Sequence, residues 1–240
     1  MSEKIEYWES DRHWQAYTDK RSKAGPYKSE EYFIKRVLRS RDKALDVGCA
    51  CGGYFPILQG QQPDIAYQGV DISAKAVDLA QKTHPTANFR TLDASQGLPF
   101  GDREFDYVQC LNVQVHVPDW RNLFRECWRV SKRDLLFDIR LLAQNGEHKS
   151  VASMEEGDVP YIFLGQDTVH SMLAEIRGQV QGLHIFGYYH PPQTEAIMPP
   201  GVKPDDCCMT ILWLSRGPLE PQFEVHLPDG LLHNVGSALF

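Results

Sequence analysis

LDVGCACGG, at residues 45–53, is the most informative stretch of this 240-residue chain. The segment from Lys43 to Val47 predicts a short strand, and the small residues after it lead toward a helix that begins near Tyr54, with Pro56 in its first turn. Small residues allow a ligand to approach the backbone closely, and a helix N-terminus offers unpaired N–H groups. The stretch therefore predicts a ligand-binding turn between a strand and a helix.

Two classes of ligand use a turn of this kind. Positions 48, 50 and 53 fit the G-x-(G/A)-x-x-G pattern of dinucleotide-binding turns. Asp46, two residues before the first glycine, is poorly placed beside a pyrophosphate and well placed beside an ammonium or sulfonium group, which favours S-adenosylmethionine (SAM). A tight turn without a ligand is the third interpretation, and the turn alone does not decide among the three.

Strands and helices alternate from residue 43 to residue 142, which predicts a parallel sheet covered on both faces. After the first strand, further strands are expected at residues 67–72, 88–92, 105–111 and 134–142. Ser73 is predicted to cap a helix that Pro85 ends, and Asp119 to cap a strongly amphipathic helix. Ser29 is expected to cap an earlier helix that runs to about Arg39.

The alternation weakens after residue 143. Residues 146–158 are predicted to form a loop, and Asp167 to cap a helix. Residues 183–189 and 208–214 have strand-like composition, and the proline-rich stretch between them predicts that they are antiparallel and close the sheet edge. The stretches 190–207 and 217–230 are expected to be irregular and to lie on the surface.

These patterns divide the chain into three parts. Residues 1–39 form an N-terminal arm and helix, residues 40–216 a ligand-binding domain and residues 217–240 a C-terminal extension. The arm is rich in aromatic residues, which either form a lid over the ligand site or anchor the arm on the core: Trp8, Trp14, Tyr17 and Tyr27.

Composition and charge exclude several classes of protein. Hydrophobic residues make up 42% of the chain and charged residues 24%, which excludes a disordered chain, a collagen-like repeat and a coiled coil. The net charge is −7 and no Lys/Arg cluster is present, so no nucleic acid partner is expected. No apolar run approaches the ~20 residues of a membrane helix, and the charged start does not resemble a signal peptide, so we expect a cytoplasmic protein without a membrane partner. The six cysteines show no zinc-ligand spacing, and no metal site is predicted.

Further acidic residues stand where predicted strands end. Asp71 lies in GVDIS after the second strand, and Asp93-Ala94 follows the third. A carboxylate at the first position can accept both hydroxyls of a ribose, and one at the second position can accept the amino group of an adenine. Because the carboxyl ends of parallel strands meet in one crevice, these acids predict a nucleoside-bearing ligand there.

The sequence resembles the class I SAM-dependent methyltransferases, particularly the group that acts on small molecules and glycans. Five blocks over about residues 40–142 carry the resemblance: LDVGCACGG, GVDIS, LDASQGLPF, EFDYVQCLNVQVHVPDW and LFRECWRVSKRDLLFDIRL. Ala50 stands where the family usually has glycine, and Lys132-Arg133-Asp134 where many members have a Pro-Gly-Gly turn. The resemblance implies an α/β fold with a Rossmann-like, seven-stranded, mostly parallel sheet, an antiparallel last strand and helices on both faces.

The resemblance also implies that SAM is the cofactor and that the loops after the first four strands bind it. The residues carried over are Asp46, Gly48, Cys49, Ala50, Gly52, Asp71, Ile72, Asp93, Ala94, Cys110 and Leu111. The first loop would surround the methionine part, Asp71 would hold the ribose and Ile72 would pack on the adenine. Asp93 and Ala94 would flank the base, while the last two residues would lie near the transferable methyl group.

His116 is the first candidate for a catalytic base, because an imidazole titrates near neutral pH. Packing is the alternative role, since many relatives carry a histidine in a similar H-V-P-D loop. Weaker candidates from the C-terminal part are His170, His184, His190 and Tyr161. Arg140 is expected to pair with Asp138 rather than with an acidic acceptor.

The expected activity is transfer of a methyl group from SAM to a hydroxyl, or an amine, of a small molecule or sugar. Amino-methyltransferases of nucleic acids carry an Asn/Asp-Pro-Pro-aromatic motif after the fourth strand, where this chain has Cys110-Leu111-Asn112-Val113. Three alternatives stay open: non-methyl chemistry of SAM such as cyclisation or another group transfer, an NAD(P)-dependent oxidoreductase, and a binding module without turnover. A homodimer is also left open.

Overall fold

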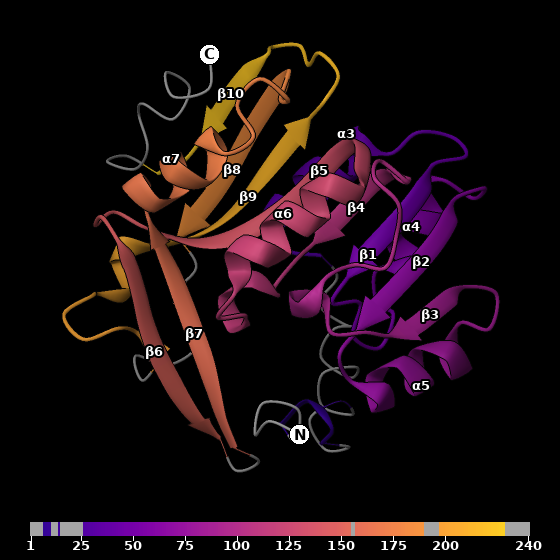
Figure 1. The fold of residues 1–240 in the computed structure, drawn as a ribbon, viewed down its shortest axis with the longest axis horizontal. Helices are drawn as coiled ribbons and strands as arrows, with labels where there is room; N and C mark the ends of the chain where they lie inside the picture. The colour runs from indigo at the N-terminus through magenta and orange to yellow at the C-terminus, as the bar shows by residue number, and fades with distance from the viewer. Residues whose placement is uncertain (1–6, 11–13, 15–25, 155–156, 190–196, 229–240) are drawn as a thin grey trace.

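The structure, a computed structural model, describes residues 7–10, 14, 26–154, 157–189 and 197–228. Within these ranges one sheet holds ten strands in the order β10-β8-β9-β5-β4-β1-β2-β3, with β7 attached to β5 and β6 to β7 (Figure 1). The strands are β1 Lys43–Val47, β2 Ala66–Asp71, β3 Asn88–Thr91, β4 Phe105–Cys110, β5 Ser131–Leu142, β6 Glu147–Met154, β7 Gly157–Gly165, β8 Gly182–Tyr189, β9 Cys207–Ser215 and β10 Phe223–His226. The helices are α3 Lys28–Val37, α4 Phe55–Gln61, α5 Ala74–Thr83, α6 Trp120–Val130 and α7 Gln166–Ala174, with short 3-10 helices η1 Ala94–Gln96, η2 Gln114–His116 and η4 Pro204–Asp206. Tyr17, His190 and residues 229–240, for which the sequence made predictions, lie outside the described residues.

The predicted α/β architecture is confirmed. β1 to β5 run parallel, whereas β9 is antiparallel to both β5 and β8. The expected seven strands are present in the order β3-β2-β1-β4-β5-β9-β8, and β9 is their antiparallel member. The sheet is nevertheless larger than predicted, because β6, β7 and β10 add three strands to it.

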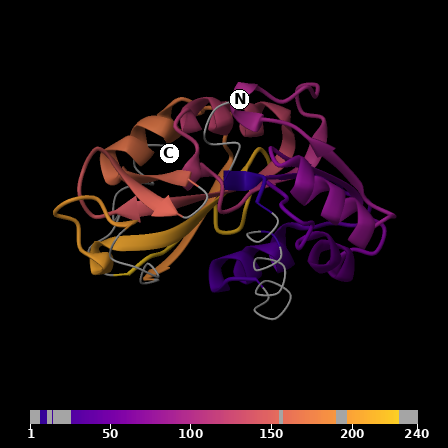
Figure 2. The same cartoon turned by 90° about the horizontal axis from the view of Figure 1, so that it is seen from below.

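Helices cover both faces of the sheet, as predicted (Figure 2). On one face, Leu123 of α6 packs in a buried cluster with Leu45 and Val47 of β1. On the other face, Phe33 of α3 shares a cluster with Ala44 of the same strand. Successive side chains of a strand point to opposite faces, so a strand covered on both sides is apolar at nearly every position.

Two of the four predicted helix caps are confirmed and two, Ser29 and Asp167, are wrong. Asp167 lies inside the first turn of α7, whose N-cap is Gly165. Ser73 and Asp119 each accept a backbone N–H from the third residue beyond, at the starts of α5 and α6. Ser29 does not cap α3. The N-cap is Tyr27, whose backbone N–H donates to the Glu30 carboxylate at 2.6 Å. The helix therefore begins two residues earlier than the sequence indicated, and its first turn carries a buried acid.

The predicted loop over residues 146–158 is wrong, because most of it is a β-hairpin. β6 pairs antiparallel with β7 along its full length, from Glu147 opposite Leu164 to Met154 opposite Gly157. β6 reads EHKSVASM. Its more exposed and less exposed positions alternate along the strand, but apolar and polar residues do not alternate with them. Among the residues that the structure describes, its one strand partner is β7, and this one-sided pairing tolerates a polar strand that periodicity does not reveal.

A second correction concerns the stretch 217–230, which was expected to be irregular. Four of its residues form β10, which pairs in parallel with β8 over Leu183–Phe186. A strand of four residues is too short to show a period of two, and pairing with an existing sheet edge supplies its backbone hydrogen bonds.

Three general properties of the described part of the chain bear on function. None of its helices combines the length and apolar character that a membrane span requires. The six cysteines are free and buried. In the ranges that the structure covers, no three His, Cys, Asp or Glu side chains gather in an arrangement suited to a metal ion.

Arg133 has a structural role in the stretch that stands where many family members have a Pro-Gly-Gly turn before β5. α6 passes directly into β5 at Ser131, and the Arg133 guanidinium donates to both carboxylate oxygens of Asp42, at 2.9 and 2.8 Å. It also pairs with Asp134 on the same strand. Both carboxylates are almost fully buried, so the arginine neutralises two charges that water does not reach.

Arg133→Met is expected to lower the free energy of unfolding by about 3 kcal/mol, because it leaves Asp42 and Asp134 buried without a cation. The matched control is Lys132→Met, which breaks an exposed pair with Asp106 and should cost less than about 1 kcal/mol. Urea unfolding of both variants measures the difference. Equal losses of unfolding free energy would show that the buried ion pairs of Arg133 stabilise the fold no more than the exposed pair of Lys132.

Candidate active site

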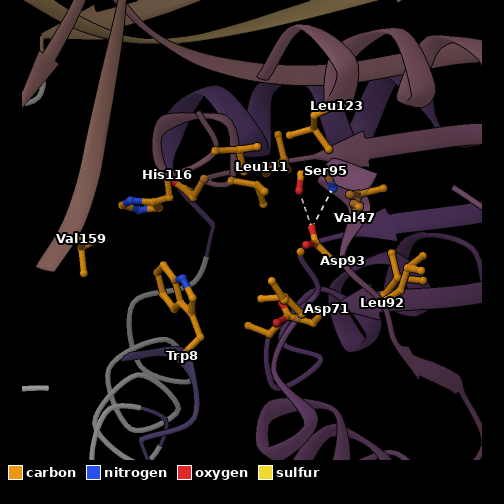
Figure 3. Close-up of a pocket in the computed structure, with 18 of the residues that line it drawn as sticks. Trp8, Val47, Asp71, Leu92, Asp93, Ser95, Leu111, His116, Leu123 and Val159 are labelled. Atoms are coloured by element: carbon orange, nitrogen blue, oxygen red, sulfur yellow. Dashed lines mark hydrogen bonds between the residues drawn. The ribbon is translucent and has the colours of Figure 1, made fainter. Parts of the chain in front are cut away.

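A cavity of about 460 Å³ lies at the carboxyl ends of β1, β2, β3 and β4 (Figure 3). Strand-end loops line one side, and the N-terminal arm and β7 line the other. The lining residues are Tyr7, Trp8, Trp14, Tyr27, Val47, Gly48, Ala50, Val70, Asp71, Ile72, Leu92, Asp93, Ala94, Ser95, Gln96, Leu111, Asn112, Val113, His116, Val117, Pro118, Leu123, Val159 and Tyr161. Open parallel sheets bind ligands in this position.

Most of the site residues predicted from the sequence meet in this cavity. Those that line it are Gly48, Ala50, Asp71, Ile72, Asp93, Ala94, Leu111 and His116. Four others do not reach it: Asp46, Cys49, Gly52 and Cys110. Cys49 and Cys110 are buried in the core, and burial raises the pKa of both thiols well above the usual range.

The loop after β1 is held in an unusual backbone conformation. Gly48 has φ +77°, and a Cβ at this position would lie 2.1 Å from the side chain of Val113, so only glycine fits. Ala50 also adopts a positive φ, of 48°, which is uncommon for a residue with a side chain. The backbone N–H groups of Gly48 and Cys49 both donate to the Val70 carbonyl and thereby fasten the loop to the end of β2.

Asp71 connects the first two loops of the site. Its carboxylate accepts the Ala50 N–H at 2.8 Å and the Ser73 N–H at 2.9 Å. Burial raises the pKa of this carboxyl, and the backbone hydrogen bonds oppose the rise. Each carboxylate oxygen can accept more than one hydrogen bond, so the group can still receive the hydroxyls of a ribose.

Asp46 faces away from the cavity, although the sequence placed it beside the ammonium group of the ligand. It lies on the face of β1 that α3 and α4 cover, whereas the neighbouring Val47 lines the cavity. Its carboxylate accepts the Tyr67 hydroxyl at 2.7 Å and the Gln109 side-chain amide at 2.8 Å. Desolvation outweighs these two hydrogen bonds and raises the pKa of Asp46 to about 6.

Asp93 lies at the end of β3 and begins η1. Its Oδ1 accepts both the backbone N–H and the hydroxyl of Ser95, at 3.0 and 2.6 Å (Figure 3). Ile72 and Ala94 line the same cavity and add apolar surface to it. A flat base with an amino group at its edge fits this combination of apolar surface and acceptor.

His116 stands at the opposite side of the cavity, between the arm and β7. Its Nδ1 lies 3.0 Å from the Pro160 carbonyl oxygen. Its ring makes edge-to-face contacts with Trp8, at 5.3 Å between centroids, and with Tyr161, at 4.8 Å. Because a carbonyl oxygen can only accept, Nδ1 carries the proton, and in the neutral imidazole the lone pair belongs to Nε2.

The predicted pairing of Arg140 with Asp138 is confirmed. The two side chains are joined at 2.9 Å, and a second nitrogen of Arg140 donates to the Asn112 side chain at 2.8 Å. Asn112 in turn donates to Glu30 in the first turn of α3. The guanidinium is thus engaged in a network behind the cavity wall.

Sequence reasoning missed the contribution of the hairpin. Val159 reaches the cavity from β7, and it lies just beyond the predicted loop, in a stretch where the sequence predicted no element. Tyr161 was named as a weak candidate, and it too lies in the lining. The run VPYIFLG could have suggested a strand, but nothing in it indicates that the strand lies over the first half of the chain. His170 and His184 are absent from the cavity lining.

Comparison with known proteins agrees with this geometry. The family described as methyltransferase domain matches residues 45–137. The demethylmenaquinone methyltransferase of Thermotoga maritima is 34% identical over 92 residues, which are 38% of this chain and 40% of that protein. The ubiquinone biosynthesis O-methyltransferase of Pseudomonas fluorescens is 29% identical over 102 residues, 41% of this chain and 43% of that protein. The chain thus matches less than half the length of these relatives.

Solved structures extend the likeness of fold beyond the matched segment. The structure of the cyclase SpnF superposes with a TM-score of 0.57 over 80% of both chains, at 18% identity. Fold, cavity and family match agree with a class I SAM-dependent methyltransferase domain. Residues 45–137 of this chain match that family, and SAM is the cofactor that the match implies. The NAD(P)-dependent alternative is therefore set aside.

Asp46→Asn is expected to change how stability depends on pH. An aspartate in the unfolded chain has a pKa near 4, so between about pH 4 and pH 6 the native state keeps a proton that the unfolded chain releases, and the free energy of unfolding falls as the pH rises. This loss amounts to about 3 kcal/mol, and the variant lacks it. Urea unfolding across this range measures both proteins, with Asp78→Asn on the exposed side of α5 as the control. Parallel profiles for wild type and Asp46→Asn would contradict the assignment.

Proposed function

We propose that this chain transfers a methyl group from SAM to a hydroxyl, or an amine, of a small molecule or sugar. One observation carries the proposal: a single cavity holds two strand-end carboxylates, Asp71 and Asp93, at one end and the imidazole of His116 at the other. The first two suit a nucleoside and the third suits proton transfer from an acceptor. The relatives act on quinone precursors by name, which supports a small-molecule acceptor.

The residues at the first end fit SAM in their chemistry. Asp71 offers carboxylate oxygens for the ribose, and Asp93 offers an acceptor for the adenine amino group. Ile72 and Ala94 belong to the same lining and offer apolar surface to the base. Gly48 lines the cavity, so the methionine part can approach a stretch of backbone that carries no side chain of its own. SAM, when bound, supplies a methyl group on a sulfonium, and the chemistry it brings is displacement of a neutral thioether.

The chain's own part in the reaction is alignment and proton removal. As the acceptor oxygen takes up the methyl group that SAM would supply, the hydroxyl proton would pass to Nε2 of His116. The Pro160 carbonyl keeps the proton of the neutral ring on Nδ1, so Nε2 is the basic atom. Trp8 and Tyr161 fix the plane of the ring through edge-to-face contacts.

The division of the chain into three parts belongs to the same proposal. Residues 1–39 form the acceptor-side lid of a SAM-binding domain at 40–216. In support, Glu9 accepts the Ala74 and Lys75 N–H groups at 2.7 and 3.2 Å, and Trp14 donates to the Ser73 hydroxyl at 3.0 Å. The extension at 217–240 contributes β10 to the sheet edge.

A titration and a product analysis test the proposed function. S-adenosylhomocysteine (SAH) and NADH are titrated into the protein by calorimetry, and we expect micromolar binding of SAH alone. The protein is then incubated with SAM and a panel of hydroxylated small molecules. Release of SAH with a methylated acceptor supports methyl transfer, whereas release of methylthioadenosine would establish another sulfonium reaction. Failure to bind SAH would overturn the proposal.

Asp71→Asn is expected to weaken SAH binding about 10- to 100-fold, because hydrogen bonds between ribose hydroxyls and a charged carboxylate contribute about 1.5–3 kcal/mol. The fold should persist, since an amide oxygen can still accept one backbone N–H. Asp78→Asn, an exposed change on α5, is the matched control and should leave affinity unchanged. Calorimetric titration with SAH measures both, and equal affinities would remove the ribose role.

His116→Ala is expected to lower turnover about 100- to 10,000-fold, the usual range for loss of a general base, while SAH affinity changes little. His116→Gln serves as the second variant, because it fills the space without restoring a basic nitrogen. Turnover is measured as SAH release with the best acceptor from the panel, together with its pH profile. Full activity in both variants, or a parallel loss of SAH binding, would assign a packing role to the ring.

A further inference from the structure

The cavity has two chemically different ends (Figure 3). Asp71 and Asp93 lie at the end already assigned to SAM. Trp8, His116 and Val159 gather at the opposite end, contributed by the arm, η2 and β7. Under the proposed function this second end must receive the methyl acceptor, so its chemistry indicates what the acceptor is.

Three aromatic rings form a corner at the acceptor end. The imidazole of His116 lies between Trp8 and Tyr161, with interplanar angles of 63° and 78°. Edge-to-face packing of this kind is favourable for flat rings, in addition to the gain from the area that is buried. A further flat ring can extend the same arrangement and bring a hydroxyl group toward His116.

Side chains of β7 line this corner of the cavity. Val159 and Tyr161 alternate with Pro160, so both point to the cavity while the Pro160 carbonyl reaches His116. Burial raises the pKa of Tyr161, and the nearby Arg140 opposes the rise. The phenol therefore keeps its proton near neutral pH and presents a polar but uncharged edge to the acceptor.

The charges around the cavity disfavour an anionic acceptor. Among the lining residues that the structure describes, none is a lysine or an arginine, and the acids lie at the SAM end. Arg140, behind the wall, is already paired with Asp138 and Asn112. A carboxylate or phosphate on the acceptor would thus be desolvated without a cation among these residues, which is costly.

We propose that the acceptor is an uncharged aromatic hydroxyl compound whose ring packs among Trp8, His116 and Tyr161. This inference rests on the proposed function and narrows its acceptor from small molecules in general to phenols and related hydroxylated rings. The β6–β7 hairpin is then the element that selects the acceptor.

Three probes separate ring packing from charge. Catechol, protocatechuate (the same ring with a carboxylate) and methyl glucoside are titrated by calorimetry into protein saturated with SAH. We expect catechol to bind at least tenfold more tightly than either of the others. Equal or tighter binding of protocatechuate or of the glucoside would overturn the proposal, and so would absence of catechol binding.

Variants at the corner test where the ring binds. Tyr161→Ala and Trp8→Ala should each weaken catechol binding about three- to tenfold, and Tyr161→Phe, which keeps the ring, should restore most of it. Val151→Ala is the matched control, because Val151 lies opposite Pro160 on β6 with 55% of its surface exposed. Unchanged affinity in both alanine variants would overturn the assignment of the corner.

SAH affinity, measured on the same samples, distinguishes failure of the proposed function from failure of the aromatic-acceptor proposal. Protein that binds SAH but not catechol contradicts the aromatic acceptor alone. Protein that fails to bind SAH contradicts the proposed function and the acceptor assignment with it.

Discussion

The site depends on one carboxylate, that of Asp71, which holds two loops of the sheet in a fixed relation. By accepting the Ala50 and Ser73 N–H groups, it joins the turn after β1 to the start of α5. The left-handed backbone at Gly48 and Ala50 is stable because neighbouring residues hold it in place, as strained conformations require. The same group that shapes the turn also faces the cavity, so the ribose would meet a carboxylate that is already oriented.

Buried carboxylates in this fold are stabilised in two ways, by an ion pair or by hydrogen bonds alone. Arg133 neutralises Asp42 and Asp134 at the end of the sheet away from the cavity, whereas Asp46 has hydrogen-bond donors but no cation. The uncompensated acid lies at the end of β1, next to the turn that follows it, and its partners Tyr67 and Gln109 reach it from β2 and β4. A fully satisfied polar network that spans three strands specifies their register as well as their contacts.

The acceptor side is assembled from parts that are distant in the chain. Trp8 comes from the arm, His116 from the loop after β4, and Tyr161 from a hairpin that follows β5. The loop with His116 belongs to the motifs that carry the resemblance to methyltransferases, and Trp8 belongs to the aromatic arm noted from the sequence. The hairpin belongs to neither. The hairpin is an addition to the seven-stranded core, which is consistent with a common cofactor site combined with a variable acceptor site.

The amino-acid sequence by itself determined the parallel sheet, the caps at Ser73 and Asp119, and the position of the acids at strand ends, because each is a local pattern. It also identified Asp71, Asp93 and His116 as residues that share a crevice, since parallel strands bring their carboxyl ends together. Tertiary structure alone decided which face Asp46 occupies, because the pleat of β1 and the helices on each face settle its direction. It alone decided that β6 and β7 exist and that Tyr161 meets His116, because pairing between distant segments leaves no periodic trace in a short polar strand.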